Sequence, residues 1–222
     1  MIQKSTGRGG DRKLQAVFFD FDGVVLNSVQ VKTEAFAHMF RPYGPDIEAA
    51  VVAYHLEHGG VSRFEKFRYF YDKLLRLPLV ESELQVLGNE FSSLVLSKVL
   101  AADFIPGCLE TLRELKRLKV PAFVVSGTPE YEMLHIVESR KLNEFFDEIH
   151  GAPRSKSEIL ADILSRFGFL PKTCWFLGDA MTDWRAAREC GVNFLGIVPE
   201  GEPSPFPPAT KVASQILFPF DR

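Results

Sequence analysis

The chain has 222 residues, of which 46% are apolar and 25% charged, and its formal net charge is −3. This composition suits one large globular domain or two modest ones. With no basic excess, nucleic acid is not an expected partner, and any charge that binds phosphate must be local. The three cysteines lie far apart without CxxC spacing, which favours a reduced, cytoplasmic protein.

The first stretch of the chain, residues 1–13, is polar and contains glycines, and we expect it to be a disordered tail. It lacks the apolar segment of a signal peptide. No apolar run elsewhere approaches the roughly 20 residues of a membrane span. A membrane partner is therefore not expected either.

Short apolar runs recur along the chain and predict buried parallel strands. They combine β-branched and aromatic residues and are bounded by small or acidic ones. The runs are LQAVFF (14–19), PAFVVS (121–126), CWFLG (174–178), VNFLGIV (192–198) and SQILF (214–218). Helical patterns lie between them, over 109–118 and 159–167. Strands alternating with helices predict an α/β fold with a doubly wound, mostly parallel sheet.

Residues 29–103 break this alternation, because they hold several amphipathic helical patterns and no convincing strand. In SRFEKFRYFYDKLL (62–75), aromatic and leucine side chains share one helix face, and charged side chains take the other. We interpret the aromatic face as core packing. The expected organisation is a small helical domain at 29–103, inserted into a larger domain made of 14–28 and 104–222. DFIPG (103–107) is the expected return hinge.

Polar residues follow the predicted strands at their carboxyl ends, where ligands bind in open α/β sheets. Asp20 and Asp22 end the first strand, and GDAMTD (178–183) follows CWFLG. Unpaired buried carboxylates are costly, so a cation or a chemical role should hold these acids in place. The oxygens of Asp20, Asp22 and Asp179 suit Mg²⁺, which favours carboxylates, waters and phosphate.

The stretch SGTP (126–129) follows the second predicted strand. Pro129 is a favourable first residue of a helix, so we expect Thr128 to cap a helix there. The Ser126 hydroxyl and nearby backbone N–H groups would then face a site suited to an anion. An ordinary helix cap explains this stretch equally well.

The stretch SKSE (155–158) has the spacing of a capping box and predicts the start of a helix. Lys156 then falls in the first turn, where a cation opposes the helix dipole. Alone, such a lysine is a surface residue. Beside an acidic site prepared for phosphate, we interpret it as an anion ligand.

Together these motifs resemble the four motifs of the haloacid dehalogenase (HAD) superfamily. They are DxDGV at 20–24, an apolar strand ending in Ser126, Lys156 opening a helix, and GDxxxD at 178–183, in that order. The helical insert after the first motif resembles the cap domain of the subgroup that contains phosphoglycolate phosphatase and β-phosphoglucomutase. The resemblance implies a Rossmann-like core with a small all-helical cap.

The resemblance also implies roles for the acidic residues. Asp20 would be the nucleophile that forms an aspartyl-phosphate. Asp22 would protonate the leaving oxygen and then deprotonate the water that clears the intermediate. Mg²⁺ would be held by the Asp20 carboxylate, the Asp22 backbone carbonyl and Asp179, with Asp183 binding the metal or orienting its ligands.

The phosphoryl oxygens would be held by residues after the second strand and at the start of the later helix. These expected phosphate ligands are Ser126, Gly127, Thr128 and Lys156. The candidates to contact the leaving group from the cap are Arg63, His58 and Lys32. We interpret His58 as a solvated helix end rather than as a catalytic base.

Within the superfamily, an aspartate at position 22 implies phosphoester chemistry rather than dehalogenation. GVSR (60–63) resembles a β-phosphoglucomutase cap stretch whose arginine grips a second phosphate, a role that Arg63 suits. Lys32, however, stands where that mutase has a histidine, and Gly178 stands where it has an acid. These departures favour a phosphatase over a mutase.

We therefore expect an Mg²⁺-dependent phosphatase for a small phosphorylated metabolite, such as a sugar phosphate or phosphoglycolate. One alternative is a phosphosugar mutase. Another is a HAD-fold protein that binds a phosphorylated ligand without turning it over. The protein is expected to be a monomer or a homodimer.

Overall fold

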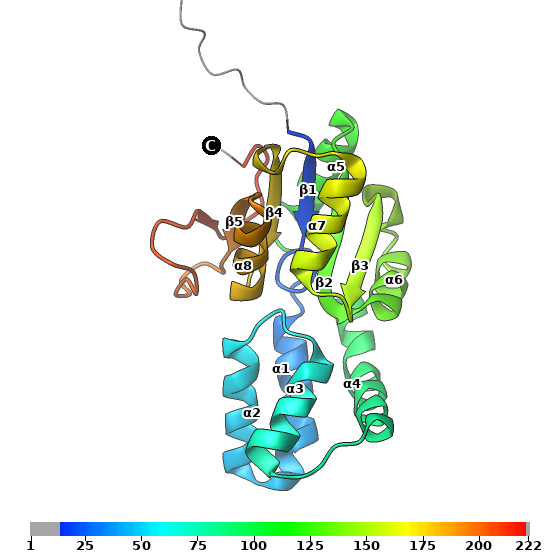
Figure 1. Ribbon diagram of the computed structural model, residues 1–222, viewed down its shortest axis with the longest axis vertical. Coiled ribbons are helices and arrows are strands. Elements are labelled where there is room, and N and C mark those ends of the chain that lie inside the picture. The colour runs from blue at the N-terminus through cyan, green and yellow to red at the C-terminus, as the bar shows by residue number, and fades with distance from the viewer. Residues whose placement is uncertain (1–13, 221–222) are drawn as a thin grey trace, which may run out of the picture.

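A single six-stranded sheet forms the centre of the computed structural model, which describes residues 14–220 (Figure 1). The strands are β1 (Ala16–Phe19), β2 (Ala122–Pro129), β3 (Glu148–Ala152), β4 (Cys174–Gly178), β5 (Asn193–Ile197) and β6 (Val212–Ala213). Their order is β3-β2-β1-β4-β5-β6, and every neighbouring pair is parallel. The doubly wound parallel sheet predicted from the sequence is confirmed, whereas the tail expected at 1–13 lies outside the described residues.

Two details of the sheet differ from the prediction. SQILF (214–218) is not a strand, because the short β6 ends at Ala213, before it. Within this run, Ile216 is fully buried and its carbonyl accepts a hydrogen bond from Thr111 Oγ1 at 3.1 Å. Ile216 therefore packs in the core, but the run does not extend the sheet, and its residues Ser214, Gln215 and Leu217 are exposed. The edge strand β3 was missed because its sequence, EIHGA, is half polar and only partly buried.

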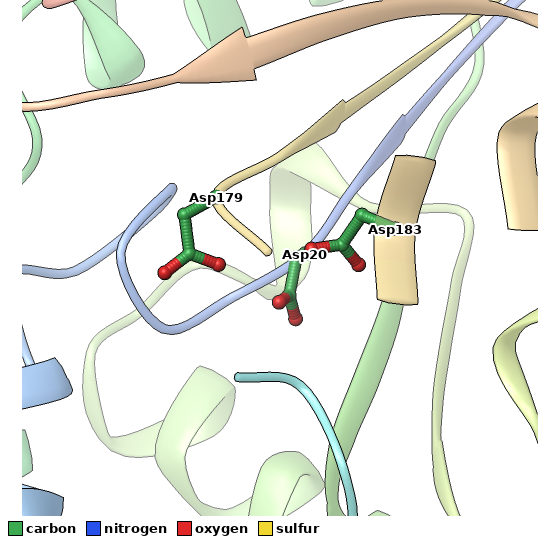
Figure 2. A group of neighbouring side chains, drawn as sticks. All are labelled: Asp20, Asp179 and Asp183. Atoms are coloured by element: carbon green, nitrogen blue, oxygen red, sulfur yellow. The ribbon is translucent and has the colours of Figure 1, made fainter. Parts of the chain in front are cut away.

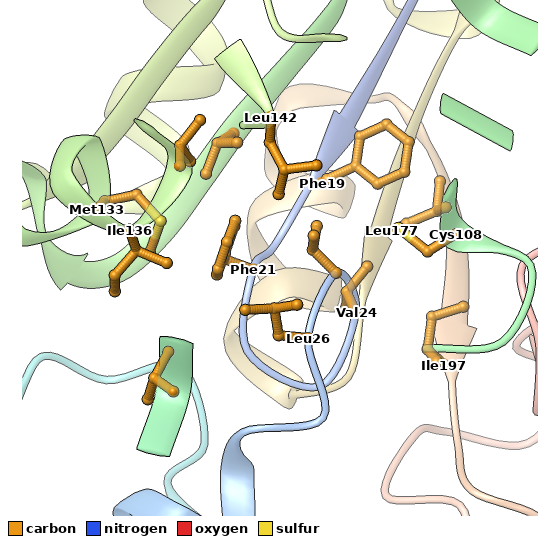
Figure 3. Close-up of a cluster of buried hydrophobic side chains, with 14 of the residues drawn as sticks. Phe19, Phe21, Val24, Leu26, Cys108, Met133, Ile136, Leu142, Leu177 and Ile197 are labelled. Carbon is orange, nitrogen blue, oxygen red and sulfur yellow. The ribbon is translucent and has the colours of Figure 1, made fainter. Parts of the chain in front are cut away.

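Helices cover both faces of the sheet and give the core three layers. They are α5 (Cys108–Leu118), α6 (Glu130–Ser139), α7 (Lys156–Phe167) and α8 (Met181–Cys190). Phe18 packs in a cluster with α7 and α8, and its neighbour Phe19 packs in a cluster with α5 and α6. Alternation along β1 thus supplies both faces of the sheet with aromatic packing. Figure 3 shows the second cluster, in which Phe21 and Leu26 of the loop after β1 join Ile136 of α6.

Between β1 and α5 the described chain is helical. The helices are α1 (Val29–Phe40), α2 (Pro45–Glu57), α3 (Arg63–Tyr69) and α4 (Glu81–Ala101). A π-helical turn, η2 (Phe70–Leu75), continues α3, and a short 3₁₀ turn, η1 (Arg41–Tyr43), follows α1. Two further 3₁₀ turns, η3 (Asn143–Phe145) and η4 (Pro171–Thr173), lie outside this segment, before β3 and β4. We call residues 29–103 the helical insert. It lies beyond the carboxyl ends of the strands (Figure 1).

Aromatic side chains form the centre of the helical insert. Five buried phenylalanine rings pack together there, namely Phe36, Phe40, Phe67, Phe70 and Phe91. In the pairs that Phe36 and Phe67 make with the others and with each other, the ring centroids are 4.4 to 6.2 Å apart. The prediction of aromatic core packing is confirmed. Two charged side chains of the same stretch are buried as well, since Arg63 is 5% and Lys66 2% exposed. The predicted charged face is thus only partly a solvent face.

The chain enters and leaves the helical insert through two adjacent segments. The Asn27 N–H donates to the Asp103 carbonyl at 2.9 Å, and the Ile105 N–H donates to the Val25 carbonyl at 3.1 Å. Leu26 and Phe104 form an antiparallel bridge. Among residues 14–220, no helix has the length and apolar character needed to cross a membrane.

Candidate active site

Asp20 is the first residue after β1 and is fixed on all sides. Its N–H donates to the Leu177 carbonyl at 2.9 Å, which holds it against the end of β4. Its Oδ1 accepts from the Phe21 N–H at 2.7 Å, and its Oδ2 accepts from Lys156 Nζ at 2.7 Å. Burial raises the pKa of Asp20 to about 7; the charge of Lys156 opposes this rise and that of Asp183 adds to it.

Three carboxylates from three elements converge beside the strand ends. Figure 2 shows Asp20 after β1, Asp179 after β4 and Asp183 in the first turn of α8. One oxygen of each lies within 4.8 Å of the others. Burial, followed by the charges of Asp20 and Asp183, holds the pKa of Asp179 well above its usual range. A divalent cation would relieve this repulsion, and hard carboxylate oxygens fit Mg²⁺.

Lys156 bridges two of these acids. It begins α7, and the predicted capping box forms between Ser155 and Glu158. Its ammonium donates to Asp20 Oδ2 at 2.7 Å and to Asp183 Oδ1 at 2.5 Å. Burial works against its charge, but Asp183 and Asp20 outweigh burial and raise the pKa of Lys156. Asp183 also accepts from the Ala180 N–H at 3.0 Å, so it is well placed to orient Lys156.

Asp22 lies two residues after Asp20 and is held as an anion. Its Oδ1 accepts from Ser28 Oγ at 2.5 Å, and its Oδ2 accepts from Thr128 Oγ1 at 3.1 Å. Lys32 Nζ donates both to Asp22 Oδ2 and, at 2.7 Å, to Thr128 Oγ1. Burial alone would raise the pKa of Asp22, but the charge and hydrogen bond of Lys32 outweigh it and lower the pKa.

The stretch SGTP (126–129) lies at the carboxyl end of β2 and differs from the prediction. Thr128 does not cap a helix, because β2 continues through Pro129 and α6 begins at Glu130 with Pro129 as its N-cap. The Thr128 hydroxyl is engaged by Asp22 and Lys32 instead. The Thr128 N–H donates to Ser126 Oγ at 3.1 Å, and this hydrogen bond fixes the buried Ser126 hydroxyl near the end of β2.

A cavity of about 150 Å³ lies between these residues and the helical insert. Its lining includes Asp20, Asp22, Gly127, Thr128 and Asp179 from the sheet side. The turn after α2 closes over it. A Cβ on Gly127 would lie 2.3 Å from the Gly60 carbonyl oxygen, and Thr182 Oγ1 donates to the Gly59 carbonyl at 2.9 Å. Only a glycine at 127 permits this close approach.

The three candidates from the helical insert have different surroundings. Lys32 lines the cavity and contacts Asp22. Arg63 lines it too, but its guanidinium donates to Glu132 Oε1 at 2.5 Å and to Ser92 Oγ at 2.7 Å. His58 is not in the cavity lining, because its ring stacks on Tyr54 at 3.8 Å and its Nδ1 contacts the Tyr54 carbonyl at 3.0 Å.

The lining residues that sequence reasoning missed include His55, Lys66 and Pro205. Lys66 follows Arg63 by three residues, so helical spacing places the two side chains on neighbouring positions of one face. That spacing was the available signal for Lys66. Nothing in the sequence pattern marks His55, since α2 has apolar residues on all sides, or Pro205, which lies in an irregular loop.

Acids at the ends of β1 and β4, a buried lysine between them and hydroxyls at the end of β2 define a doubly wound α/β protein with a carboxylate-centred site. The chain belongs to the haloacid dehalogenase-like hydrolase family, whose model matches residues 17–197. The resemblance noted from the motifs is thereby confirmed.

Named relatives agree with this family. The chain is 25% identical over 182 residues to phosphoglycolate phosphatase 1 of Pseudomonas aeruginosa, a match that covers 80% of this chain but 66% of that protein, slightly under two thirds. It is 23% identical over 195 residues to the phosphorylated carbohydrates phosphatase of Thermotoga maritima, covering 83% and 86% of the two chains. The fold is similar to that of β-phosphoglucomutase from Clostridium difficile, with a TM-score of 0.70, 19% identity, and coverage of 83% and 85%.

Proposed function

We propose that this protein is an Mg²⁺-dependent phosphatase that hydrolyses a small phosphomonoester through an aspartyl-phosphate on Asp20. The observation that carries the proposal is the meeting of Asp20 and Asp179 in the lining of a partly enclosed cavity, with Lys156 bonded to Asp20. The family membership and the phosphatase names of the relatives support the same reaction. They also support phosphoglycolate or a sugar phosphate as the substrate class.

In the first step, a carboxylate oxygen of Asp20 attacks phosphorus and the phosphorus–oxygen bond of the ester breaks. Asp22 gives its proton to the departing oxygen, so the product leaves as an alcohol. Mg²⁺ held by the Asp20 carboxylate, the Asp22 carbonyl and Asp179 would offset the phosphoryl charge. Lys156 and Ser126 hold phosphoryl oxygens, and the Lys156–Asp183 contact keeps the ammonium in position.

In the second step, water attacks the phosphorus of the aspartyl-phosphate and Asp22 takes the water proton. The phosphorus–oxygen bond to Asp20 breaks, which releases inorganic phosphate and restores the Asp20 carboxylate. The low pKa of Asp22 means that it rests as the anion that this step requires. Before each first step, Asp22 must acquire a proton against the influence of Lys32.

The helical insert acts in this proposal as a cap that covers the site, joined to a core domain of residues 14–28 and 104–222. The contacts of Gly59 and Gly60 with the core side support such a closed arrangement. Closure would exclude water during the first step and place contacts for the leaving group. Opening would then admit water and release the product.

Two residues favour a phosphatase over a mutase. A mutase must protect its aspartyl-phosphate from water, and the related mutase uses a histidine and an extra acid that this chain replaces with Lys32 and Gly178. A Cβ at position 178 would lie 2.2 Å from the Asp183 Cβ. The extra acid therefore cannot be accommodated here without moving Asp183 and, with it, Lys156.

The test is phosphate release from a panel of phosphoglycolate, sugar phosphates and nucleotides, with Mg²⁺ or with EDTA. We expect Mg²⁺-dependent release, which Asp20→Asn reduces by about a thousandfold or more because the nucleophile is lost. Asp162→Asn is the matched control, since Asp162 is paired with arginines outside the site. No release from any compound would contradict the proposal and favour a mutase or a binding protein. Activity retained by Asp20→Asn would contradict the role of Asp20 as the nucleophile.

A further inference from the structure

Lys66 is a buried cation in the wall of the cavity. Its residue is 2% exposed, and the cavity lining includes it together with Lys32 and Phe36. Its Nζ lies 5.7 Å from the centroid of the Phe36 ring. Within residues 14–220, the ion pairs include no carboxylate partner for this ammonium, whose polar contacts are His55 Nδ1 at 2.8 Å and the His55 carbonyl at 3.4 Å.

His55 orients Lys66 without neutralising it. Burial, followed by the charge of Lys66, lowers the pKa of His55 to about 3, so the ring is neutral near pH 7. A neutral ring that accepts from Lys66 at Nδ1 carries its hydrogen on Nε2. That Nε2 is buried and makes no hydrogen bond within the described chain. The imidazole therefore directs the ammonium but leaves its charge uncompensated.

The other cations of the cavity wall already have carboxylate partners. Lys32 is paired with Asp22, and Arg63 is paired with Glu132. Lys156, on the floor of the site, is paired with Asp20 and Asp183. Lys66 thus differs from every other cation at the described site in lacking an anion.

The surroundings of Lys66 also disfavour its charged form. Burial is the main cause and the positive charge of Lys32 the next, and together they lower the pKa of Lys66 to about 7. The more distant carboxylates of Asp179 and Asp22 only partly offset this effect. An anion entering the cavity would supply the missing partner and stabilise the ammonium.

We propose that Lys66 is a specificity-determining residue that binds a second anionic group of the substrate, a carboxylate or a phosphate, while the first phosphate lies at Asp20. This inference rests on the proposed phosphatase function and narrows its substrate class to phosphomonoesters that carry a second anionic group. The cavity volume of about 150 Å³ is below the roughly 300–1,000 Å³ of pockets for drug-sized ligands, so the two anions belong to a short molecule.

The test compares three substrates that share a two-carbon skeleton. Phosphoglycolate carries a carboxylate, ethane-1,2-diol bisphosphate carries a second phosphate, and 2-hydroxyethyl phosphate carries a neutral hydroxyl in that place. We expect the wild-type protein to prefer one of the first two, and the preferred one identifies the second anion. In Lys66→Met the ratio of kcat/KM between that substrate and 2-hydroxyethyl phosphate should fall about tenfold or more, mainly through KM.

Two further variants make the comparison specific. Lys98→Met removes an exposed lysine of the same insert and should leave the ratio unchanged. Lys66→Gln keeps a polar side chain without the charge and should lower the ratio of kcat/KM as much as Lys66→Met does. The result then does not depend on one variant that could be misfolded. A wild-type protein without preference for a second anion, or an equal loss on all three substrates in the Lys66 variants, would overturn the inference.

A binding measurement separates this inference from the proposed function. If the wild-type protein hydrolyses neither these three compounds nor any member of the earlier substrate panel, the phosphatase proposal fails, and titration calorimetry with phosphoglycolate, the bisphosphate and 2-hydroxyethyl phosphate in Mg²⁺ still tests Lys66. Tighter binding of phosphoglycolate or the bisphosphate than of 2-hydroxyethyl phosphate by the wild-type protein, lost in both Lys66 variants, would support the subsite. Equal binding of all three compounds, or a difference that survives the substitutions, would refute it.

Discussion

Lys32 and Asp22 form the contact that sets the protonation of the proposed acid–base residue. The Lys32 ammonium donates to Asp22 and to Thr128, and the Asp22 carboxylate also accepts from the hydroxyls of Ser28 and Thr128. Three donors around one carboxylate stabilise its ionised form over its protonated form. Lys32 thus lowers the fraction of Asp22 that carries a proton, whichever leaving group is bound.

This contact predicts a pH-dependent contribution of Lys32 to stability. The pKa of Asp22 is lower in the folded than in the unfolded protein, so the stabilisation is present above its unfolded pKa of about 3.9 and is lost as pH falls through the folded pKa. Lys32→Met should therefore lower the free energy of unfolding clearly at pH 7 and much less near pH 3. Urea unfolding at both pH values measures this, with Lys98→Met as the exposed control. A loss that is equal at both pH values would contradict the prediction.

At the scale of elements, one buried ion pair joins the helical insert to the sheet side. Arg63 at the start of α3 donates to Glu132 of α6, and Ser92 of α4 donates to the other Glu132 oxygen at 2.5 Å. Both charged side chains are nearly inaccessible, at 4% and 3% exposed. Because this pair is almost fully removed from water, loss of either partner would leave a buried charge without a counter-ion and would destabilise the protein.

The variant Glu132→Gln should therefore lower the free energy of unfolding by about 3–5 kcal/mol. The matched control is Glu81→Gln, which breaks the exposed Arg68–Glu81 pair and should have a far smaller effect. The double variant Arg63→Met/Glu132→Leu should recover most of the loss, since it removes both charges together. Denaturant unfolding measures all three, and a Glu132→Gln effect no larger than that of Glu81→Gln would disprove the role given to this pair.

At the scale of the whole molecule, the turn at Gly59 and Gly60 brings the helical insert against the strand ends. The Gly60 carbonyl approaches Gly127 of β2, and Gly60 itself has a φ of 72°. A side chain at 60 would meet Thr182 Oγ1 at 2.1 Å. Glycines on both sides therefore allow two backbones to meet over the cavity, where larger residues would hold them apart.

The variant Gly127→Ala should reduce kcat/KM by about a hundredfold, because its methyl group would displace the turn and leave the cavity incompletely covered. Gly168→Ala serves as the control, since a Cβ there meets nothing within 4 Å, although its backbone φ of 66° is strained for alanine. Steady-state kinetics with the best substrate of the panel, together with melting temperatures, checks both. Equal activities of the two variants would mean that closure of this turn does not limit the reaction.

The central strands, the helical insert and the core motifs could all be predicted from the order of residues along the chain. Continuous apolar runs mark β1, β4 and β5 because both faces of these strands are buried. Asp20, Asp22, Asp179 and Lys156 could be found because chain connectivity puts strand ends and helix starts at one edge of a parallel sheet. Such information is local, so it survives in the order of residues.

The hydrogen-bond and ion-pair partners of these groups could not be predicted in this way, because they come from distant parts of the chain. Arg63 and Glu132 are 69 residues apart, and Thr128 turns from its expected helix to Asp22, 106 residues away. The half-polar edge strand β3 is held by its pairing with β2. Packing of the helical insert buries Lys66 in the cavity wall without a carboxylate partner among the described residues. Hydrogen-bond partners and desolvation depend on which surfaces meet in space, and that choice is made by packing between distant segments rather than by the pattern along the chain.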